Sequence, residues 1–231
     1  MPSWGIHLLT GNELLKRINI TDKNAFLIGN FMPDAERYVV KDFSIFVPYN
    51  TSHFAEILNI QGNLERLPNF NKFIAKYKNN LNNPLILGYL THLLTDYYWN
   101  NTVNSRYTER DKNGNCIAIK LNNGTTMEAD KTVRRILKHN DFHLFEREIK
   151  QKNNLDLPVY KNNLINYLKE LEETKYNKND FIKIVNYLNN LMKTEIEDSL
   201  NEYRLYTKEQ IKVDFNDSIE FILNILKINT I

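Results

Sequence analysis

The sequence contains one cysteine, Cys116, among its 231 residues. A lone cysteine cannot close an internal disulfide, which excludes a disulfide-stabilised scaffold. Glycine and proline are also scarce, with 7 and 6 residues. That scarcity argues against a turn-rich β-sandwich or β-barrel. Neither the cysteine content nor the few turn residues therefore indicate a function.

The chain also lacks an excess of positive or negative charge. The chain has 30 Lys and Arg against 28 Asp and Glu, a formal net charge of +2. Such a balance lacks the basic footprint of a protein that binds duplex nucleic acid, although it leaves room for a small anion site. At 42% hydrophobic and 12% aromatic residues, the chain has enough apolar side chains to fold around a core.

Long hydrophobic runs are absent too. The most apolar segment, residues 84–99, is interrupted by Thr91, His92, Thr95 and Asp96, so it falls short of the about 20 apolar residues of a membrane span. The first ten residues show no basic region followed by an apolar stretch, as a secretion signal would. We therefore expect no transmembrane segment and a cytoplasmic location.

Helical periodicity dominates what is present. Apolar residues recur at helical spacing in seven segments, and Asn83 followed by Pro84 is typical of a helix start. Residues 108–129 differ, because two Asn-Gly turn dipeptides flank an alternating stretch from Cys116 to Leu121. The sequence predicts one all-α domain over residues 1–231, with a small β-hairpin insertion near residues 108–129 and a loop-rich stretch at 28–50. The expected helices cover residues 10–18, 69–79, 84–101, 130–151, 161–174, 180–204 and 216–227.

The expected helix at 84–101 contains the first candidate functional residues. Apolar residues surround it on nearly every side, which is typical of a buried helix, yet His92 and Asp96 lie four residues apart on one face. A buried carboxylate without a partner costs several kcal/mol. The compensating group is a lysine or arginine, the histidine itself in a plain His–Asp hydrogen bond, or a metal ion.

Three further segments offer metal ligands. Asp34 follows Pro33, His53 lies in a loop rich in small polar residues, and His7 follows Trp4 near the start of the chain. Two imidazoles and two carboxylates suit zinc.

Four motifs occur in order: W-x-x-H at residues 4–7, P-D at 33–34, T-x-H-F at 51–54 and G-Y-x-x-H-x-x-x-D at 88–96. This pattern resembles the zinc-dependent phospholipase C family, which is related to the fungal single-strand zinc nucleases. The resemblance implies a multi-helix phospholipase C-like bundle around a zinc cluster. It also implies that one zinc ion is held by Asp34, His53, His92 and Asp96. Asp96 would bridge to a further zinc ion that His7 also holds.

The sequence departs from the family pattern in two places. Secreted members use the amine of an N-terminal tryptophan as a ligand, whereas residues 1–3 precede Trp4 here. The remaining family zinc uses a histidine six residues after the bridging aspartate, where this chain has Thr102. His139 and His143, four apart on the expected helix at 130–151, are candidate ligands for that ion, or else a solvated pair. The resemblance thus implies one to three zinc ions.

The function implied by the resemblance is a zinc-dependent phosphoric ester hydrolase. Zinc lowers the pKa of a bound water towards about 7 and polarises a phosphodiester, and Asp34 is the candidate catalytic base. The expected substrate is a phospholipid or a small phosphoester, and the oligomeric state stays open. The alternatives are a non-catalytic protein with a structural zinc site and, less favoured by the near-neutral charge, a single-strand nuclease.

Overall fold

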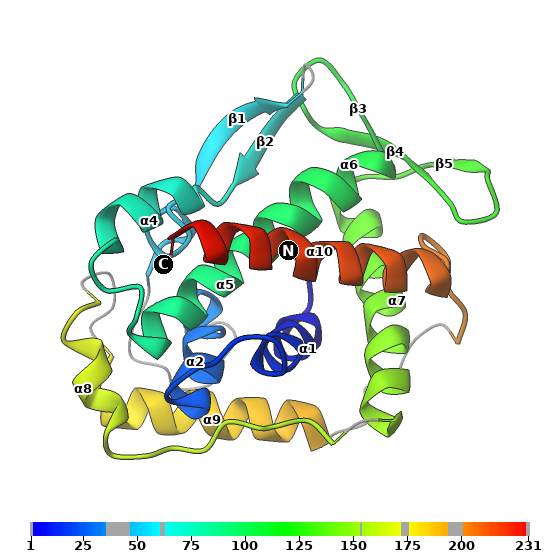
Figure 1. The fold of residues 1–231 in the computed structure, drawn as a ribbon. Coiled ribbons are helices and arrows are strands. Elements are labelled where there is room, and N and C mark those ends of the chain that lie inside the picture. Colours follow the sequence, from blue (N-terminus) through cyan, green and yellow to red (C-terminus); the bar gives the residue numbers. More distant parts are fainter. Residues whose placement is uncertain are drawn as a thin grey trace.

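The computed structural model describes residues 2–35, 47–60, 63–152, 154–171, 176–193 and 201–229. These residues form mainly helices, with two small antiparallel sheets (Figure 1). The expected mainly α fold is confirmed; the expectation that all of residues 1–231 form one domain stays a prediction. Within the described residues, no helix has the length and apolar character needed to cross a membrane.

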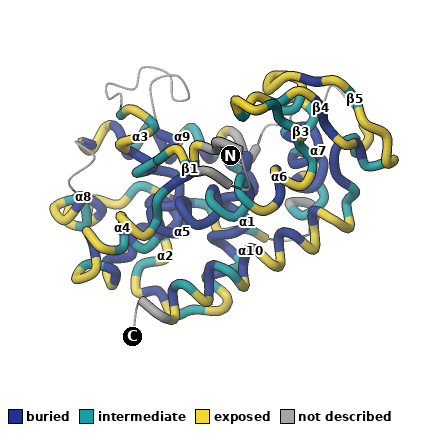
Figure 2. The backbone as a smooth tube through the Cα atoms, turned by 90° about the horizontal axis from the view of Figure 1, so that it is seen from above, coloured by how far each residue is buried: buried dark blue, intermediate teal, exposed yellow. Residues whose placement is uncertain are grey.

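The first half of the chain supplies the centre of the fold. Its elements are α1 (Trp4–Leu15), α2 (Lys23–Gly29), the short 3-10 helix η1 (Met32–Asp34), α3 (Tyr49–Ser52), β1 (Glu56–Ile60), β2 (Asn63–Leu67), α4 (Phe70–Tyr77) and α5 (Pro84–Tyr98). Helix α5 begins where the sequence predicts: the Asn83 side chain accepts hydrogen bonds from the amides of Leu85 and Ile86. Most of α5 is buried (Figure 2).

Two glycines bring α2 and α5 into close contact. A Cβ atom on Gly88 would lie 2.0 Å from the carbonyl oxygen of Phe26, and one on Gly29 would lie 2.1 Å from that of Leu85. Because no side chain fits at either point, the two backbones approach closely. This contact fixes α5 against the chain that continues from α2 into η1.

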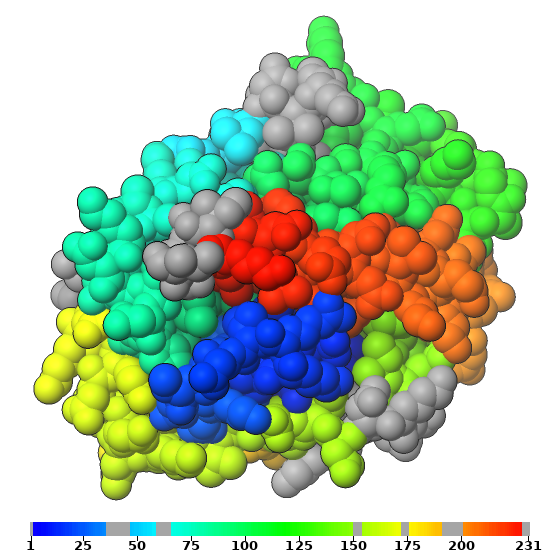
Figure 3. Space-filling model, viewed as in Figure 1, coloured from blue at the N-terminus to red at the C-terminus, as the bar shows by residue number. Residues whose placement is uncertain are grey.

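The second half of the chain surrounds this centre. Its elements are η2 (Trp99–Val103, a π-helix), α6 (Asn104–Arg106), β3 (Thr108–Arg110), β4 (Cys116–Lys120), β5 (Thr126–Glu128), α7 (Lys131–Lys152), α8 (Leu164–Leu168), α9 (Lys178–Lys193) and α10 (Lys208–Asn229). On the face shown in Figure 3, α10 lies against the N-terminal segment, where Arg17 and Glu220 form an ion pair.

The expected β-structure at residues 108–129 is present as a three-stranded antiparallel sheet in the order β3-β4-β5. Gly114 and Gly124 in the two Asn-Gly turns have φ angles of +82° and +84°. Such angles are accessible to glycine without steric cost, so these two turns explain the signal in the sequence.

Confining β-structure to that segment was wrong, because β1 and β2 form a second sheet with Glu56 opposite Leu67. Ile57 on β1 is 70% exposed, although Leu67 on β2 is buried, so the apolar residues of β1 do not mark a buried strand in the sequence. The expected loop at residues 28–50 contains the short η1, the start of α3 and residues 36–46, which lie outside the described part.

Several helix boundaries also differ from those expected. Helix α1 begins at Trp4 rather than residue 10, and it ends at Leu15. Helix α10 begins at Lys208 rather than residue 216. Helix α8 covers only Leu164–Leu168 of the helix expected at 161–174, and residues 172–174 lie outside the described part. Helix α9 ends at Lys193; residues 194–200 lie outside the described part, and residues 201–204 are not helical.

Candidate metal centre

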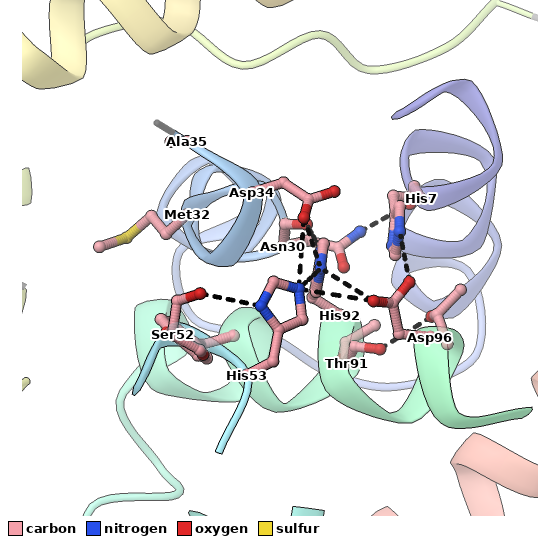
Figure 4. A network of polar contacts seen from close by, with 12 residues as sticks. His7, Asn30, Met32, Asp34, Ala35, Ser52, His53, Thr91, His92 and Asp96 are labelled. Carbon is pink, nitrogen blue, oxygen red and sulfur yellow. Dashed lines mark hydrogen bonds and ion pairs between the residues drawn. The ribbon is translucent and has the colours of Figure 1, made fainter. Parts of the chain in front are cut away.

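Five polar side chains meet inside the helical core (Figure 4). His7 comes from α1, Asp34 from η1 and His53 from the position that follows α3, while His92 and Asp96 come from one face of α5. All five are buried. The structure thus brings together every residue that the four sequence motifs selected.

One group of ligand atoms centres on His53. Its Nε2 lies 3.2 Å from Asp34 Oδ1, 3.2 Å from His92 Nε2 and 3.4 Å from Asp96 Oδ2. His92 Nε2 lies 3.8 Å from Asp34 Oδ1 and 3.9 Å from Asp96 Oδ2. These four side chains therefore present two nitrogens and two oxygens to one small space.

Asp96 faces two ways. Its Oδ2 belongs to the group around His53, whereas its Oδ1 lies 3.4 Å from His7 Nε2. Among the described residues, two sets can each hold a metal ion: Asp34, His53 and His92, and His7, His92 and Asp96. An imidazole nitrogen has one lone pair for a metal, so His92 can serve only one ion at a time, while the two oxygens of Asp96 can serve two.

Hydrogen bonds orient two of the imidazoles. His92 Nδ1 donates to the carbonyl oxygen of Asn30 at 2.9 Å, so its Nε2 carries the lone pair that faces the cluster. His53 Nδ1 and Ser52 Oγ are hydrogen-bonded at 2.8 Å. Such outer contacts are typical of metal-binding histidines.

The charge states suit a cation. Burial, reinforced by the nearby His7, lowers the pKa of His92 to about 3, which leaves a neutral imidazole at pH 7. Burial alone would raise the pKa of the Asp34 carboxyl, but His92 and His53 outweigh it and hold that pKa below its usual range. His7 and His92 lower the pKa of Asp96 in the same way against its burial. Two carboxylates and the neutral imidazole of His92 therefore converge with the rings of His7 and His53.

The cluster is incomplete without a further partner. Within the described part of the chain, both ring nitrogens of His7 and both carboxylate oxygens of Asp96 are buried and lack a hydrogen bond. Buried polar atoms in folded proteins are nearly always paired. The nitrogen and carboxylate donors are those that zinc prefers, so the residues present fit a zinc ion.

His139 and His143 are not brought to this cluster. Both lie on α7, with ring centroids 6.0 Å apart, and among the described residues neither belongs to a set that can hold a metal. Burial and the neighbouring Lys138 lower the pKa of His139 to about 3. Thr102, at the position of the family's histidine, is exposed. A metal-binding role for His139 and His143 stays a prediction.

The aromatic residues near the motifs pack as core residues. Trp99 is fully buried against Phe142, and Tyr97 packs edge-on against Phe70. A cavity of about 280 Å³ between α1, α7 and α10 is lined by Leu9, Phe145 and Phe215 among others, and by none of the five cluster residues. It is therefore separate from the metal centre.

Sequence reasoning missed the supporting residues. Tyr49 stacks on His53 with ring centroids 4.0 Å apart; burial and the carboxylates of Asp96 and Asp34 raise its pKa far above the usual range, so it stays a hydroxyl donor. Asn30 and Ser52 hold the ligands in place through hydrogen bonds. Their only signal in the sequence is that each lies within four residues of a motif ligand.

Comparison with protein families finds a match over residues 6–218 to the family described as zinc dependent phospholipase C. Comparisons with curated proteins and with solved structures found no match. The matched range contains all five cluster residues and covers most of the chain, and the family's metal is the one that the cluster fits. The chain belongs to the zinc-dependent phospholipase C family.

Proposed function

We propose that the protein hydrolyses a phosphoric diester at a zinc centre built from Asp34, His53, His92, Asp96 and His7. The family assignment supports hydrolysis and a phospholipid-type substrate. The observation that carries the proposal is the convergence of three imidazoles and two carboxylates in a buried cluster, with nitrogen–oxygen distances of 3.2–3.9 Å.

Zinc bound there would offset the charge of the phosphate and lower the pKa of a coordinated water to about 7. His53, His92, Asp34 Oδ1 and Asp96 Oδ2 would hold one ion, because their ligand atoms face one space. His7 and Asp96 Oδ1 would contribute to a second.

Asp34 is the candidate catalytic base. It is the most exposed residue of the cluster, at 8%, whereas Asp96 and His92 are fully buried. Only its Oδ1 contacts the imidazoles, and Figure 4 shows its other oxygen directed away from them. That oxygen can accept a proton from a water at the edge of the site. The lowered pKa of Asp34 keeps it ionised at neutral pH.

Tyr49 and Arg66 can contact the substrate. The guanidinium of Arg66 lies 5.3 Å from the centroid of the Tyr49 ring, which in turn stacks on His53. An exposed guanidinium beside a protonated phenol offers both a cation and a hydrogen-bond donor to a phosphate oxygen. We expect the phosphate to enter on this side.

A non-catalytic zinc protein is the second candidate. The exposed Thr102, where the family has a histidine, and the location of His139 and His143 outside both sets favour it. Such a protein would bind zinc for stability and turn over nothing. The expected cytoplasmic location and the absence of duplex nucleic acid partners stay predictions.

The deciding experiment is an ester panel. The purified protein is stripped with a chelator, reloaded with zinc, and offered nitrophenyl phosphodiesters, nitrophenyl phosphomonoesters and phospholipid vesicles. We expect the protein to hydrolyse a diester. This turnover should be lost when a chelator is added and restored when zinc is added back. Equal inertness with and without zinc on every ester supports the structural alternative instead.

A further inference from the structure

The amide of Asn30 lies inside the metal centre. Asn30 follows α2 and is fully buried. Its side-chain Nδ2 donates to the backbone carbonyl oxygen of His7 at 2.6 Å. The backbone carbonyl oxygen of Asn30 accepts a hydrogen bond from His92 Nδ1. Because the His7 carbonyl can only accept, Nδ2 must face it and the amide cannot be flipped. The position of Oδ1 follows from this bond.

Asn30 Oδ1 is left without a partner. It is buried and makes no hydrogen bond within the described part of the chain. Figure 4 shows the Asn30 side chain between His92 and His7, with its oxygen towards the space that they share with Asp96. A buried amide oxygen without a partner is costly, so an additional group is expected to bind it.

Five of the unpaired atoms belong to three neighbouring residues, His7, Asp96 and Asn30. His7 contributes two ring nitrogens, Asp96 two carboxylate oxygens and Asn30 one amide oxygen to the buried atoms that lack a hydrogen bond. His92 cannot complete this set, because its single free nitrogen faces His53 at 3.2 Å. An ion between His7 and Asp96 therefore needs another protein ligand, and Figure 4 shows the unpaired amide oxygen of Asn30 beside them.

We propose that Asn30 Oδ1 is a ligand of a second divalent cation, together with His7 Nε2 and Asp96 Oδ1. One imidazole nitrogen and two oxygens suit zinc or a similar divalent transition metal. The proposal rests on the proposed function for the first ion, in the set around His53. It assigns the amide two tasks: Nδ2 holds the backbone of α1, and Oδ1 binds the cation.

Metal stoichiometry separates these tasks. Stripped protein is titrated with zinc by calorimetry, and bound zinc is counted by elemental analysis after dialysis. Asn30→Ala removes both tasks, whereas Asn30→Asp removes the donor and keeps an oxygen ligand. Asn12→Ala is the matched control, because the buried Asn12 amide also anchors α1, donating to Leu8 O and Asp156 O at 3.0 and 3.1 Å, without touching the cluster.

We expect two zinc ions in the wild type and in Asn12→Ala, one in Asn30→Ala, and two again in Asn30→Asp. If Asn30→Ala does not fold, Asn30→Ser, whose hydroxyl is too short to reach the ion, carries the same expectation. The proposal is overturned if the alanine variant keeps both ions, if the aspartate variant loses one as the alanine variant does, or if the wild type binds a single ion. In the last case the ester panel still decides the function, since one ion and chelator-sensitive hydrolysis can coexist.

Discussion

The imidazole rings of His7 and His92 are stacked, with centroids 4.0 Å apart and planes 6° from parallel. His7 comes from α1 and His92 from α5, so this contact connects the two helices at the metal centre. Burial lowers the pKa of His92 to about 3, and repulsion by the stacked His7 adds to this effect. Neutral imidazoles are the form that binds metal.

Replacing His92 tests the shared ligand. In His92→Ala we expect bound zinc to fall from two ions to at most one per chain, because the imidazole nitrogen faces every other ligand of the first set. Elemental analysis after dialysis measures this. The matched control is Leu93→Ala, which removes a fully buried neighbour and should cost roughly 2–5 kcal/mol of stability but keep the zinc. Equal zinc content in both variants would refute the ligand role.

Asp34→Asn tests the catalytic base. The amide keeps the shape of the side chain and an oxygen towards His53, but it does not accept a proton. We expect kcat for a nitrophenyl phosphodiester to fall by about 10²-fold or more, with a thermal midpoint close to that of the wild type. A variant that retains turnover within about threefold would remove Asp34 from the mechanism.

The sequence predicted the ligand cluster because its four motifs, taken in order, resemble those of the zinc-dependent phospholipase C family; only His92 and Asp96 are close in the chain. Local signals predicted two structural elements. Asn83 and Pro84 mark the start of α5, and the Asn-Gly turns mark the sheet β3-β4-β5. One local signal was overlooked: Thr207 and Gln210 form a reciprocal capping box, each side chain bonded to the other's amide, which places the start of α10 at Lys208.

Other differences arise from contacts that no local pattern encodes. The buried Asp141 carboxylate accepts hydrogen bonds from the amides of Arg204, Leu205 and Tyr206. These bonds hold the chain in a non-helical conformation at Arg204, where the helix expected at 180–204 would end. The start of α1 depends on Glu146 of α7, which is hydrogen-bonded to Ser3 and occupies the space beside Gly5. Asn30 likewise became visible only through its contacts with His7 and His92.

Gly88→Ala tests the close contact between α2 and α5. Its new Cβ would meet the Phe26 carbonyl at 2.0 Å, so the helices must separate. We expect a loss of roughly 1–3 kcal/mol or more, measured by urea denaturation, together with weaker zinc binding because Asn30 and Asp34 follow α2. The control Gly124→Asn lies at an open turn with φ of +84°, which asparagine tolerates. A stable Gly88→Ala protein would show that the backbones are further apart.

His139→Gln tests the acid sensitivity of the zinc-free protein. Burial and Lys138 lower the pKa of His139 to about 3, against about 6.5 in the unfolded chain. Between these values the unfolded state binds the extra proton, so stability is complete above pH 6.5 and is lost as the pH falls towards 3. The glutamine variant should lose less stability than the wild type across this range in chelator-treated samples. Parallel stability curves would mean that His139 is protonated equally in both states.

The most direct test of the metal centre is a crystal structure of the zinc-loaded protein with anomalous scattering recorded on both sides of the zinc edge. The account predicts a zinc peak about 2.0–2.2 Å from ligand atoms of Asp34, His53, His92 and Asp96, and a second peak beside His7 and Asp96. An anomalous peak at His139 and His143 alone, or none within ligand distance of His92, would contradict it.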